Sequence, residues 1–309
     1  MATTNNITTT YAGEFAGTYV SAALLSGKTL AENLITIKPN IKFKEVMKKV
    51  ATTDLVKDAT CDFDATSTIT LTERILQPEE FQVNLQLCKQ DFQSDWEAVQ
   101  MGFSAYDNLP PSFADFLIAH AADKVAQKME QNIWNGTNAN AGEFDGFKTT
   151  LLADGDVVDV AAAGGGVDSS NVVAQLGAIA DAIPSAIYGS EDLFIYVSSN
   201  IYRAYVRALG GFATNVGAAG TDNKGTQWFN GGALTFDGIN VVLASGLASN
   251  TAVAAEKSNL FFGTGLLNDQ NEVKVIDMAD IDGSQNVRVV MRFTAGVQHA
   301  IGSDIVLYS

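Results

Sequence analysis

Two glycine-rich stretches resemble parts of nucleotide-binding loops. Gly27-Lys28-Thr29 has the closing residues of a phosphate-binding loop, but Ala22 stands where that loop needs its first glycine. Without this glycine the backbone cannot wrap a phosphate group. Gly263-Thr264-Gly265 lacks the third glycine of a dinucleotide-binding fingerprint. We therefore expect ordinary turns at both places and no nucleotide site.

Two aspartate-rich turns raise the question of a bound calcium ion. Asp280-Ile281-Asp282-Gly283 resembles part of a calcium loop, but Met278 and Val289 stand at its first and twelfth ligand positions, where acids are needed. Asp154-Gly155-Asp156 is a second short acidic turn. A weak surface calcium site and a plain turn remain open for both, and the plain turn is favoured.

Few residues are suited to acid–base or nucleophilic catalysis. The chain has two cysteines, Cys61 and Cys88, and two histidines, His120 and His299, and their spacing gives no reason to join them. It has no Gly-x-Ser-x-Gly nucleophile elbow. The sequence therefore predicts a protein that is not an enzyme, with no catalytic residue, no metal site and no cofactor.

The composition narrows the class of protein further. The 309 residues are 47% apolar and carry a net charge of −16, so the chain can build a sizeable core but has no basic stripe for gripping nucleic acid. Two cysteines cannot form a disulfide framework. With no signal peptide and no long apolar run in sight, we expect a soluble protein folded in a reducing cytoplasm, without membrane contact.

The elements of the first half include an extended pair of strands. Polar and β-branched residues alternate over 67–71, and apolar and polar residues alternate over 81–87, with a break at 78–80. The polar stretch 58–66 predicts the tip of a long hairpin that is polar on both sides. Such a hairpin exposes strand edges that another chain would need to cover. A basic cluster (Lys42, Lys44, Lys48 and Lys49) is read as a solvated face or as a contact for an acidic partner, including another copy.

A long helix is predicted over 112–134. Ser112 and Asp115 form a capping pair, and Asn135-Gly136 ends the helix. The apolar residues recur at helical spacing and predict the buried face: Ile118, Ala122, Val125, Met129 and Ile133.

The second half mixes helices and strands, which predicts an α+β fold. We expect helices over 171–182 and from 199 or 200 to 209, the latter with Tyr202, Tyr205, Val206 and Leu209 on one face. Strands are expected over 193–197, 260–262, 273–276, 287–293 and 305–308. The Asp237-Gly238 dipeptide predicts a tight hairpin over 234–244. Residues 210–232 form a long glycine-rich loop, and the first 20 residues form an arm rich in Thr, Asn and Gly.

This order of parts resembles a known family. The phrases that carry the resemblance are LCKQDFQSDWEA, QNIWNGTNANAGEFDGF, LFIYVSSNIYRAY, FDGINVVLASGL, SNLFFGTGLLND and NVRVVMRFTAGVQHAIGSDIVLYS. The chain is similar to the major capsid proteins of tailed double-stranded-DNA bacteriophages, which have the Hong Kong phage-type capsid fold.

The resemblance implies a division of the chain. Residues 1–42 would be an N-terminal arm, 43–90 an extended β-hairpin loop, 91–150 with 257–309 a peripheral domain containing the spine helix, and 151–256 an axial domain. It also implies candidate contacts between subunits, which are Lys57, Asp62, Phe63, Asp64, Glu79, Glu80, Phe212, Trp228 and Phe229. Lys57 is the only lysine near the hairpin tip, and no covalent crosslink is expected.

The resemblance further implies a function and partners. Copies of the chain would form pentamers and hexamers of an icosahedral shell that encloses phage double-stranded DNA, made in the host bacterial cytoplasm and ending in the virion capsid. A separate scaffolding protein, a portal and a decoration protein would be its partners. The alternatives are an encapsulin-like nanocompartment shell and, more distantly, a surface-layer or adhesin protein. An enzyme built on 151–256 would need a catalytic cluster that the sequence does not offer.

Overall fold

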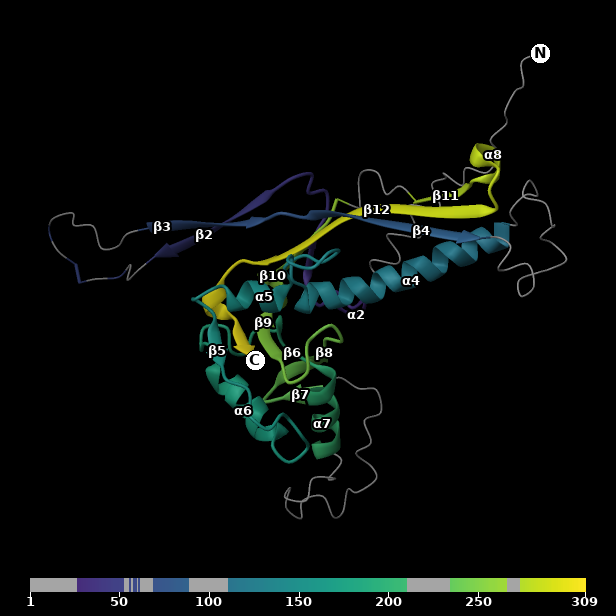
Figure 1. Cartoon of the computed structure of the whole chain (residues 1–309). Coiled ribbons are helices and arrows are strands. Elements are labelled where there is room, and N and C mark those ends of the chain that lie inside the picture. The colour runs from purple at the N-terminus through teal and green to yellow at the C-terminus, as the bar shows by residue number, and fades with distance from the viewer. Residues whose placement is uncertain are drawn as a thin grey trace.

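The computed structural model describes residues 27–52, 56, 58–59, 61, 69–88, 111–209, 234–265 and 273–309. It is an α+β structure with an elongated upper layer and a block of sheet and helices below it (Figure 1). A two-stranded hairpin projects from one end of the upper layer. The predicted glycine-rich loop 210–232 and the first 20 residues lie outside the described residues.

The upper layer is a sheet built around one long strand. β12 (Asn286–His299) pairs antiparallel with β4 (Glu79–Cys88), β11 (Val273–Asp277) and β10 (Leu260–Gly263), and β10 pairs in parallel with β1 (Thr36–Lys38). Buried and more accessible residues alternate along β12 as far as Ala295, as expected for a sheet with one covered face. The predicted strand 287–293 is therefore confirmed but extends to residue 299.

The predicted spine helix lies under this sheet as α4 (Pro111–Asn135) (Figure 1). All five residues of its predicted apolar face are buried: Ile118, Ala122, Val125, Met129 and Ile133. The helix begins at Pro111, one residue earlier than predicted, so Ser112 lies in the first turn and not at the N-cap. Proline suits the first helical position because its missing N–H would have no partner there.

The lower block contains a six-stranded sheet. Its order is β5 (Val158–Val160), β13 (Val306–Tyr308), β9 (Ala252–Glu256), β6 (Leu193–Val197), β8 (Ile239–Leu243) and β7 (Leu234–Phe236). Alternate residues of β6 belong to different cores: Tyr196 packs with α4, whereas Ile195 and Val197 pack with α6 (Val172–Ala182) and α7 (Ser199–Leu209). The predicted Asp237-Gly238 turn is confirmed, with φ of 48° and 81°.

The buried face of α7 differs from the predicted one. The structure buries Ile201, Ala204, Tyr205 and Ala208, while Leu209 is 43% exposed. Ala204 and Ala208 thus take places in the core that were predicted for larger residues, and Tyr202 and Val206 are only partly buried against it. The remaining short elements are α2 (Lys28–Ala31), α5 (Phe147–Leu152), α8 (Ala279–Asp282), and the 3-10 turns η2 (Lys257–Asn259) and η3 (Gly302–Asp304).

The segment around α2 packs into the body of the subunit. Leu30, Leu34 and Ile35 are buried in the core beside α4. The Thr29 hydroxyl donates to Glu130 Oε1 at 2.5 Å and accepts from Trp134 Nε1 at 2.7 Å. Residues 27–38, the second part of the predicted arm, are therefore anchored within the chain itself.

Candidate interaction surface

The projecting hairpin consists of β2 (Glu45–Thr52) and β3 (Ile69–Leu76). Its register places Val46 opposite Ile75, Lys48 opposite Glu73, Val50 opposite Leu71 and Thr52 opposite Ile69. Directly opposed residues of an antiparallel pair lie on the same face. Most of the large apolar positions of both strands therefore lie on one face of the hairpin, together with the opposed pair Lys48 and Glu73.

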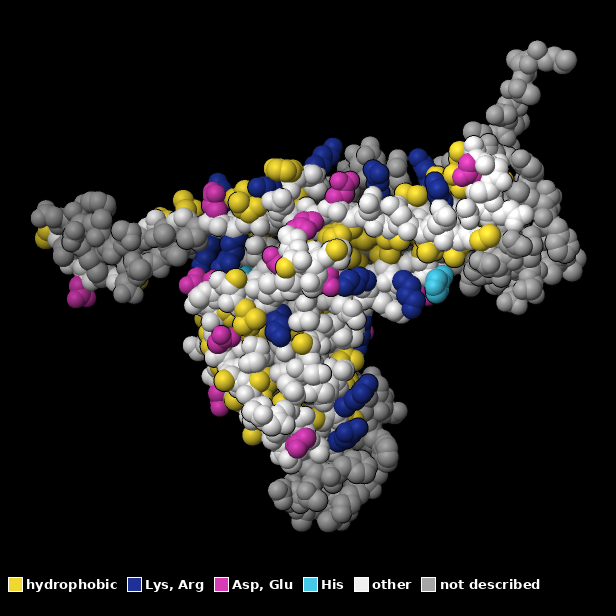
Figure 2. Space-filling model, viewed as in Figure 1, with side chains coloured by type: hydrophobic (Ala, Val, Ile, Leu, Met, Phe, Trp, Pro, Cys, Tyr) yellow, Lys and Arg dark blue, Asp and Glu magenta, His cyan; other side chains and the backbone are white. Residues whose placement is uncertain are grey.

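This face is exposed to solvent in the single subunit. Val46 is 46% exposed, Ile69 67%, Leu71 63% and Ile75 47%, and we call these four residues the apolar face of the hairpin. In Figure 2, yellow hydrophobic side chains lie among dark blue and magenta charged ones on the described part of the hairpin. The prediction of a hairpin that is polar on both sides is wrong, because the pairing register collects the apolar residues of two strands that look half-polar when taken singly.

An exposed apolar face of this kind is stabilised by a partner. Burying apolar surface contributes about 25 cal/mol per Å², so covering a half-exposed Ile or Leu is worth about 1 kcal/mol. β2 and β3 pair only with each other in the described part of the chain, and an isolated two-stranded hairpin is marginal in water. The outer edges of both strands also offer unpaired backbone groups. The hairpin therefore presents both an exposed apolar face and unpaired strand edges that another surface could cover.

The base of the hairpin, in contrast, is fastened to the body. Leu76 is fully buried, and Gln298 Nε2 donates to the Ile75 carbonyl at 3.2 Å. Arg74 forms an ion pair with Asp154, and Lys38 of β1 forms another with Glu45. The hairpin thus projects from a fixed base and not from a loose linker.

Two of the predicted contact residues lie within the described part of the chain. Glu79 begins β4, is half-buried, and accepts a hydrogen bond from Asn138 Nδ2 at 2.6 Å. Burial, together with the nearby Asp145 carboxylate, raises the pKa of Glu79. Glu80 is exposed on β4. The other predicted contacts lie outside the described residues: Lys57, Asp62, Phe63, Asp64, Phe212, Trp228 and Phe229.

Sequence reasoning missed the apolar face itself. Ile69, Leu71 and Ile75 occupy odd positions of β3, and that spacing is the signal that was available. The structure also shows where two other predicted features lie. In the basic cluster, Lys42, Lys44 and Lys48 are exposed and Lys49 is half-buried. β4, which belongs to the predicted extended loop, pairs along its whole length with β12.

The structure also describes residues from the candidate nucleotide, calcium and catalytic sites. Thr29 of the phosphate-loop-like stretch is buried against the Glu130 carboxylate, which would repel a phosphate. Asp282 accepts a bond from the Ser284 amide at 2.9 Å and closes a turn. His120 is exposed on α4, whereas His299 is fully buried at the end of β12.

Among the residues that the structure describes, no three His, Cys, Asp or Glu side chains gather as they would around a metal ion. No helix in this part of the chain is long and apolar enough to cross a membrane.

Comparison with known proteins reveals likeness at the level of structure. No protein-family model matches the sequence, and no curated protein does. A structure from Mycobacterium phage Che8 aligns over 100% of this chain and 94% of its own, with a TM-score of 0.55 and 12% identity. The capsid of a native GTA particle aligns over 93% and 89%, with a TM-score of 0.58 and 14% identity.

A third match comes from a different kind of particle. A virus-like particle from Pyrococcus furiosus aligns over 96% of this chain and 100% of its own, with a TM-score of 0.53 and 9% identity. Together these likenesses show that the chain has the capsid fold that the sequence resemblance implied.

Proposed function

We propose that this chain is the structural subunit of an icosahedral shell, assembling with copies of itself into pentamers and hexamers. The observation that carries the proposal is the exposed apolar face of a hairpin whose base is fixed to a capsid-type fold. A shell forms when one modest contact repeats with closed symmetry. Because each subunit is held by several neighbours at once, the single contact need not be strong. The role is structural and not enzymatic.

We assign the parts of the chain as the resemblance implies. Residues 1–42 form the arm, 43–90 the extended loop, 91–150 with 257–309 the peripheral domain, and 151–256 the axial domain. Within this arm, Leu30, Leu34 and Ile35 are buried beside α4 of the same subunit. Within the extended loop, β4 pairs with β12 of the proposed peripheral domain.

We infer that the apolar face of the hairpin lies on a neighbouring copy. Five of the predicted contacts would take part at the hairpin and its base: Lys57, Asp62, Phe63, Asp64 and Glu80. The bond from Asn138 makes Glu79 a weaker candidate, because its carboxylate already has a partner within the subunit. Phe212, Trp228 and Phe229 would face the symmetry axis of a pentamer or hexamer.

The contents of the shell are the double-stranded DNA of a tailed phage in this proposal. A net charge of −16 suits a wall that encloses DNA without gripping it. A separate scaffolding protein, a portal and a decoration protein would complete the particle, which would be made in a bacterial host cytoplasm. The likeness to the virus-like particle supports a second candidate, a nanocompartment that encloses a cargo protein.

Negative-stain electron microscopy with light scattering tests self-assembly. We expect shells, tubes or capsomers from the purified chain, alone or with a scaffold-like partner. A variant with Ile69→Ser, Leu71→Ser and Ile75→Ser should keep the melting temperature and lose the assemblies. Val173→Ser is the matched control, since Val173 is 48% exposed but lies on α6 in the lower block. Assemblies from the triple variant that equal those of the control would contradict the proposal.

The contents of particles from the native source separate the two candidates. Nuclease-protected double-stranded DNA supports a phage capsid, and a co-purifying cargo enzyme without DNA supports a nanocompartment. A stable single subunit of 32.7 kDa under all conditions would overturn both.

A further inference from the structure

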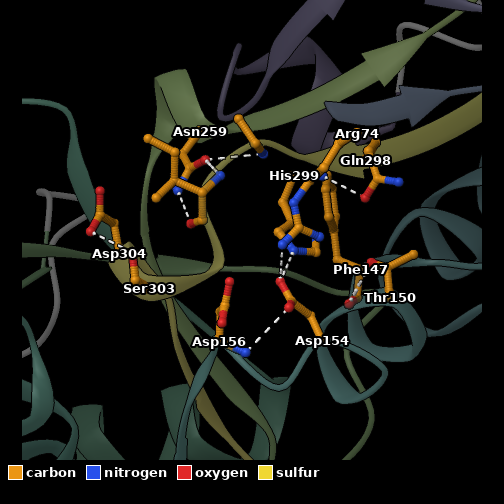
Figure 3. Close-up of polar contacts among 12 residues, drawn as sticks. Arg74, Phe147, Thr150, Asp154, Asp156, Asn259, Gln298, His299, Ser303 and Asp304 are labelled. Carbon is orange, nitrogen blue, oxygen red and sulfur yellow. Dashed lines mark hydrogen bonds and ion pairs between the residues drawn. The ribbon is translucent and has the colours of Figure 1, made fainter. Parts of the chain in front are cut away.

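Three side chains from distant parts of the chain meet at the base of the hairpin (Figure 3). Arg74 comes from β3, Asp154 from the turn after α5, and His299 from the last position of β12. His299 Nε2 lies 2.8 Å from Asp154 Oδ2, and the Arg74 guanidinium donates to the same oxygen. One carboxylate oxygen therefore joins the hairpin to two elements of the body.

We propose that Asp154 is a positioning residue that fixes the angle of the hairpin to the body, and that a second proton on His299 releases this joint. The joint is a property of the single subunit. Its consequence, control of the geometry with which neighbours are engaged, rests on the proposed function.

The surroundings of Asp154 hold the carboxylate in one place. Its other oxygen, Oδ1, accepts the Asp156 backbone N–H at 3.2 Å. A Cβ atom on Gly302 would lie only 2.2 Å from Oδ2, so a residue without a side chain is needed beside it. The Asp154 side chain is 13% exposed and that of Arg74 is 25% exposed, and partial burial strengthens the ion pair relative to one in bulk water.

The charge states follow from these contacts. Burial by itself would raise the pKa of Asp154, but hydrogen bonds from His299, the Asp156 amide and Arg74 hold that pKa below its ordinary value. Burial lowers the pKa of His299, and the Arg74 charge adds to this effect against the opposing bond to Asp154. At neutral pH, therefore, Asp154 is ionised and His299 is neutral, and the Nε2–H group of His299 donates a hydrogen bond to the Asp154 carboxylate.

A second proton on His299 has no good position in this arrangement. His299 Nδ1 is buried and has no hydrogen-bond partner among the described residues. A proton there would create an unpaired buried donor and a positive charge near Arg74. Of the other acids in the view, Asp156 donates its backbone N–H to Asp154 Oδ1, whereas Asp304 accepts a hydrogen bond from the Ser303 hydroxyl at 3.3 Å. Opening of the joint would remove this penalty, because water could then hydrogen-bond to the Nδ1–H group and solvate the charge of the protonated ring.

The hairpin amplifies any change at this joint. A strand advances about 3.3 Å per residue, so Ile69, at the far end of β3, lies about 17 Å from Arg74. A rotation of about 10° at Arg74 would move Ile69 by about 3 Å. That displacement is enough to change which surface of a neighbour the apolar face meets.

Distances between two spin labels test the joint in the full-length chain. Cys61 is exposed beyond the paired strands and takes one label. Asp181→Cys on α6 takes the other in a Cys88→Ser background, since Asp181 is exposed. A large excess of unlabelled chain ensures that the distances arise within one subunit, whether or not the subunits assemble.

We expect a narrow distance distribution at about pH 8 and one about twofold broader at about pH 5, a range in which histidine titrates and Asp154 stays ionised. Asp154→Asn and Arg74→Met should be broad at both pH values. His299→Gln, which keeps a donor for Asp154 but cannot titrate, should stay narrow at both. Arg207→Met, an exposed cation on α7, is the matched control and should behave like the parent chain.

Two results would overturn the inference. A parent-like distribution at pH 8 in both Asp154→Asn and Arg74→Met, with folded circular dichroism spectra, would show that the joint does not set the angle. Acid broadening that persists in His299→Gln would show that His299 is not the group that releases it. A chain that never forms shells would refute the proposed function and leave these distance measurements valid.

Discussion

The hairpin and the lower block are made from similar residues that are used in opposite ways. In the block, strands β6, β9 and β13 bury their side chains on both faces, against α4 on one side and α6 with α7 on the other. In the hairpin, Ile69 and Leu71 remain mostly exposed. Strands of similar composition thus have their apolar side chains buried within the subunit in one region and exposed to solvent in the other.

This difference teaches that burial within the subunit identifies what holds the fold, and exposure identifies what holds the assembly. The two roles meet in β3, where Leu76 is fully buried and Leu71 is 63% exposed. Mutations on the two sides of this boundary should therefore separate stability from assembly.

The largest effect is expected in the core. Val125→Asp places an unpaired charge on the buried face of α4 and should lower the free energy of unfolding by about 4 kcal/mol or more. Chemical denaturation followed by circular dichroism measures it. Gln127→Asp, at an exposed position of the same helix, is the control, and equal effects of the two would show that the helix face is wrongly assigned.

A pair of leucine truncations on one strand sharpens the comparison. Leu76→Ala should cost about 2–5 kcal/mol, as large-to-small changes in a packed core do. Leu71→Ala should cost less than about 0.5 kcal/mol in the unassembled subunit, as exposed substitutions do. Denaturation midpoints of the two proteins measure the difference. Similar losses from both would mean that the hairpin face is covered within its own subunit.

A smaller loss is expected where the N-terminal segment meets α4. Thr29→Val removes the hydroxyl that donates to Glu130 and accepts from Trp134. Glu130 keeps the bonds from the Thr29 amide and the Ser245 hydroxyl, but the buried Trp134 Nε1 loses its acceptor, which should cost about 1–3 kcal/mol. Thr150→Val, whose hydroxyl bonds only to the nearby Phe147 carbonyl of α5, provides the comparison. Loss of stability in Thr150→Val that matches Thr29→Val would argue against the anchoring of residues 27–38.

Stability should also depend on pH through His299. Because burial lowers its pKa in the folded subunit from the ordinary 6.5, the unfolded chain binds more protons just below that value, and stability should fall as the pH drops below it. Asp154, with a lowered pKa, should add a further loss below about pH 4. Urea titrations across this range should show a shallower slope near pH 6 in His299→Gln than in the parent chain, and identical slopes would contradict the assignment.

The smallest effect is expected at an ion pair near the surface, where the Lys128 side chain is 44% exposed and that of Glu143 is 17% exposed. The hydrogen bond from Lys128, aided by those from Asn140 and the Thr137 amide, lowers the pKa of Glu143 to about 2. Lys128→Met should raise this pKa measurably in an NMR titration while changing the free energy of unfolding by about 1 kcal/mol or less, because ion pairs that water can reach contribute little. An unchanged Glu143 titration would show that the pair does not persist in solution.

The sequence was most informative where local pattern decides structure. The spine helix and the Asp237-Gly238 hairpin were predicted because helical spacing and turn chemistry are local. β9 was not predicted, because its residues Ala252–Glu256 are alanine-rich and buried on both faces, which removes the alternation that marks a half-buried strand. Residues 27–38 looked like free arm because the surface that buries them lies about 100 residues later in the chain.

The candidate surface was only partly predictable. The hairpin was expected from its polar tip and alternating strands, but its apolar face depends on which residues of β2 oppose those of β3, and a one-residue slip would have placed them on opposite faces. The meeting of Arg74, Asp154 and His299 spans 225 residues of chain and leaves no local trace. Such contacts follow from the fold and not from any motif.

A cryo-electron microscopy map of the assembled particle tests the central claim most directly. It should show Val46, Ile69, Leu71 and Ile75 covered by a neighbouring copy, with the hairpin base still joined to its own subunit through Asp154. A particle in which this apolar face is open to solvent, or folded back onto its own subunit, would contradict the account.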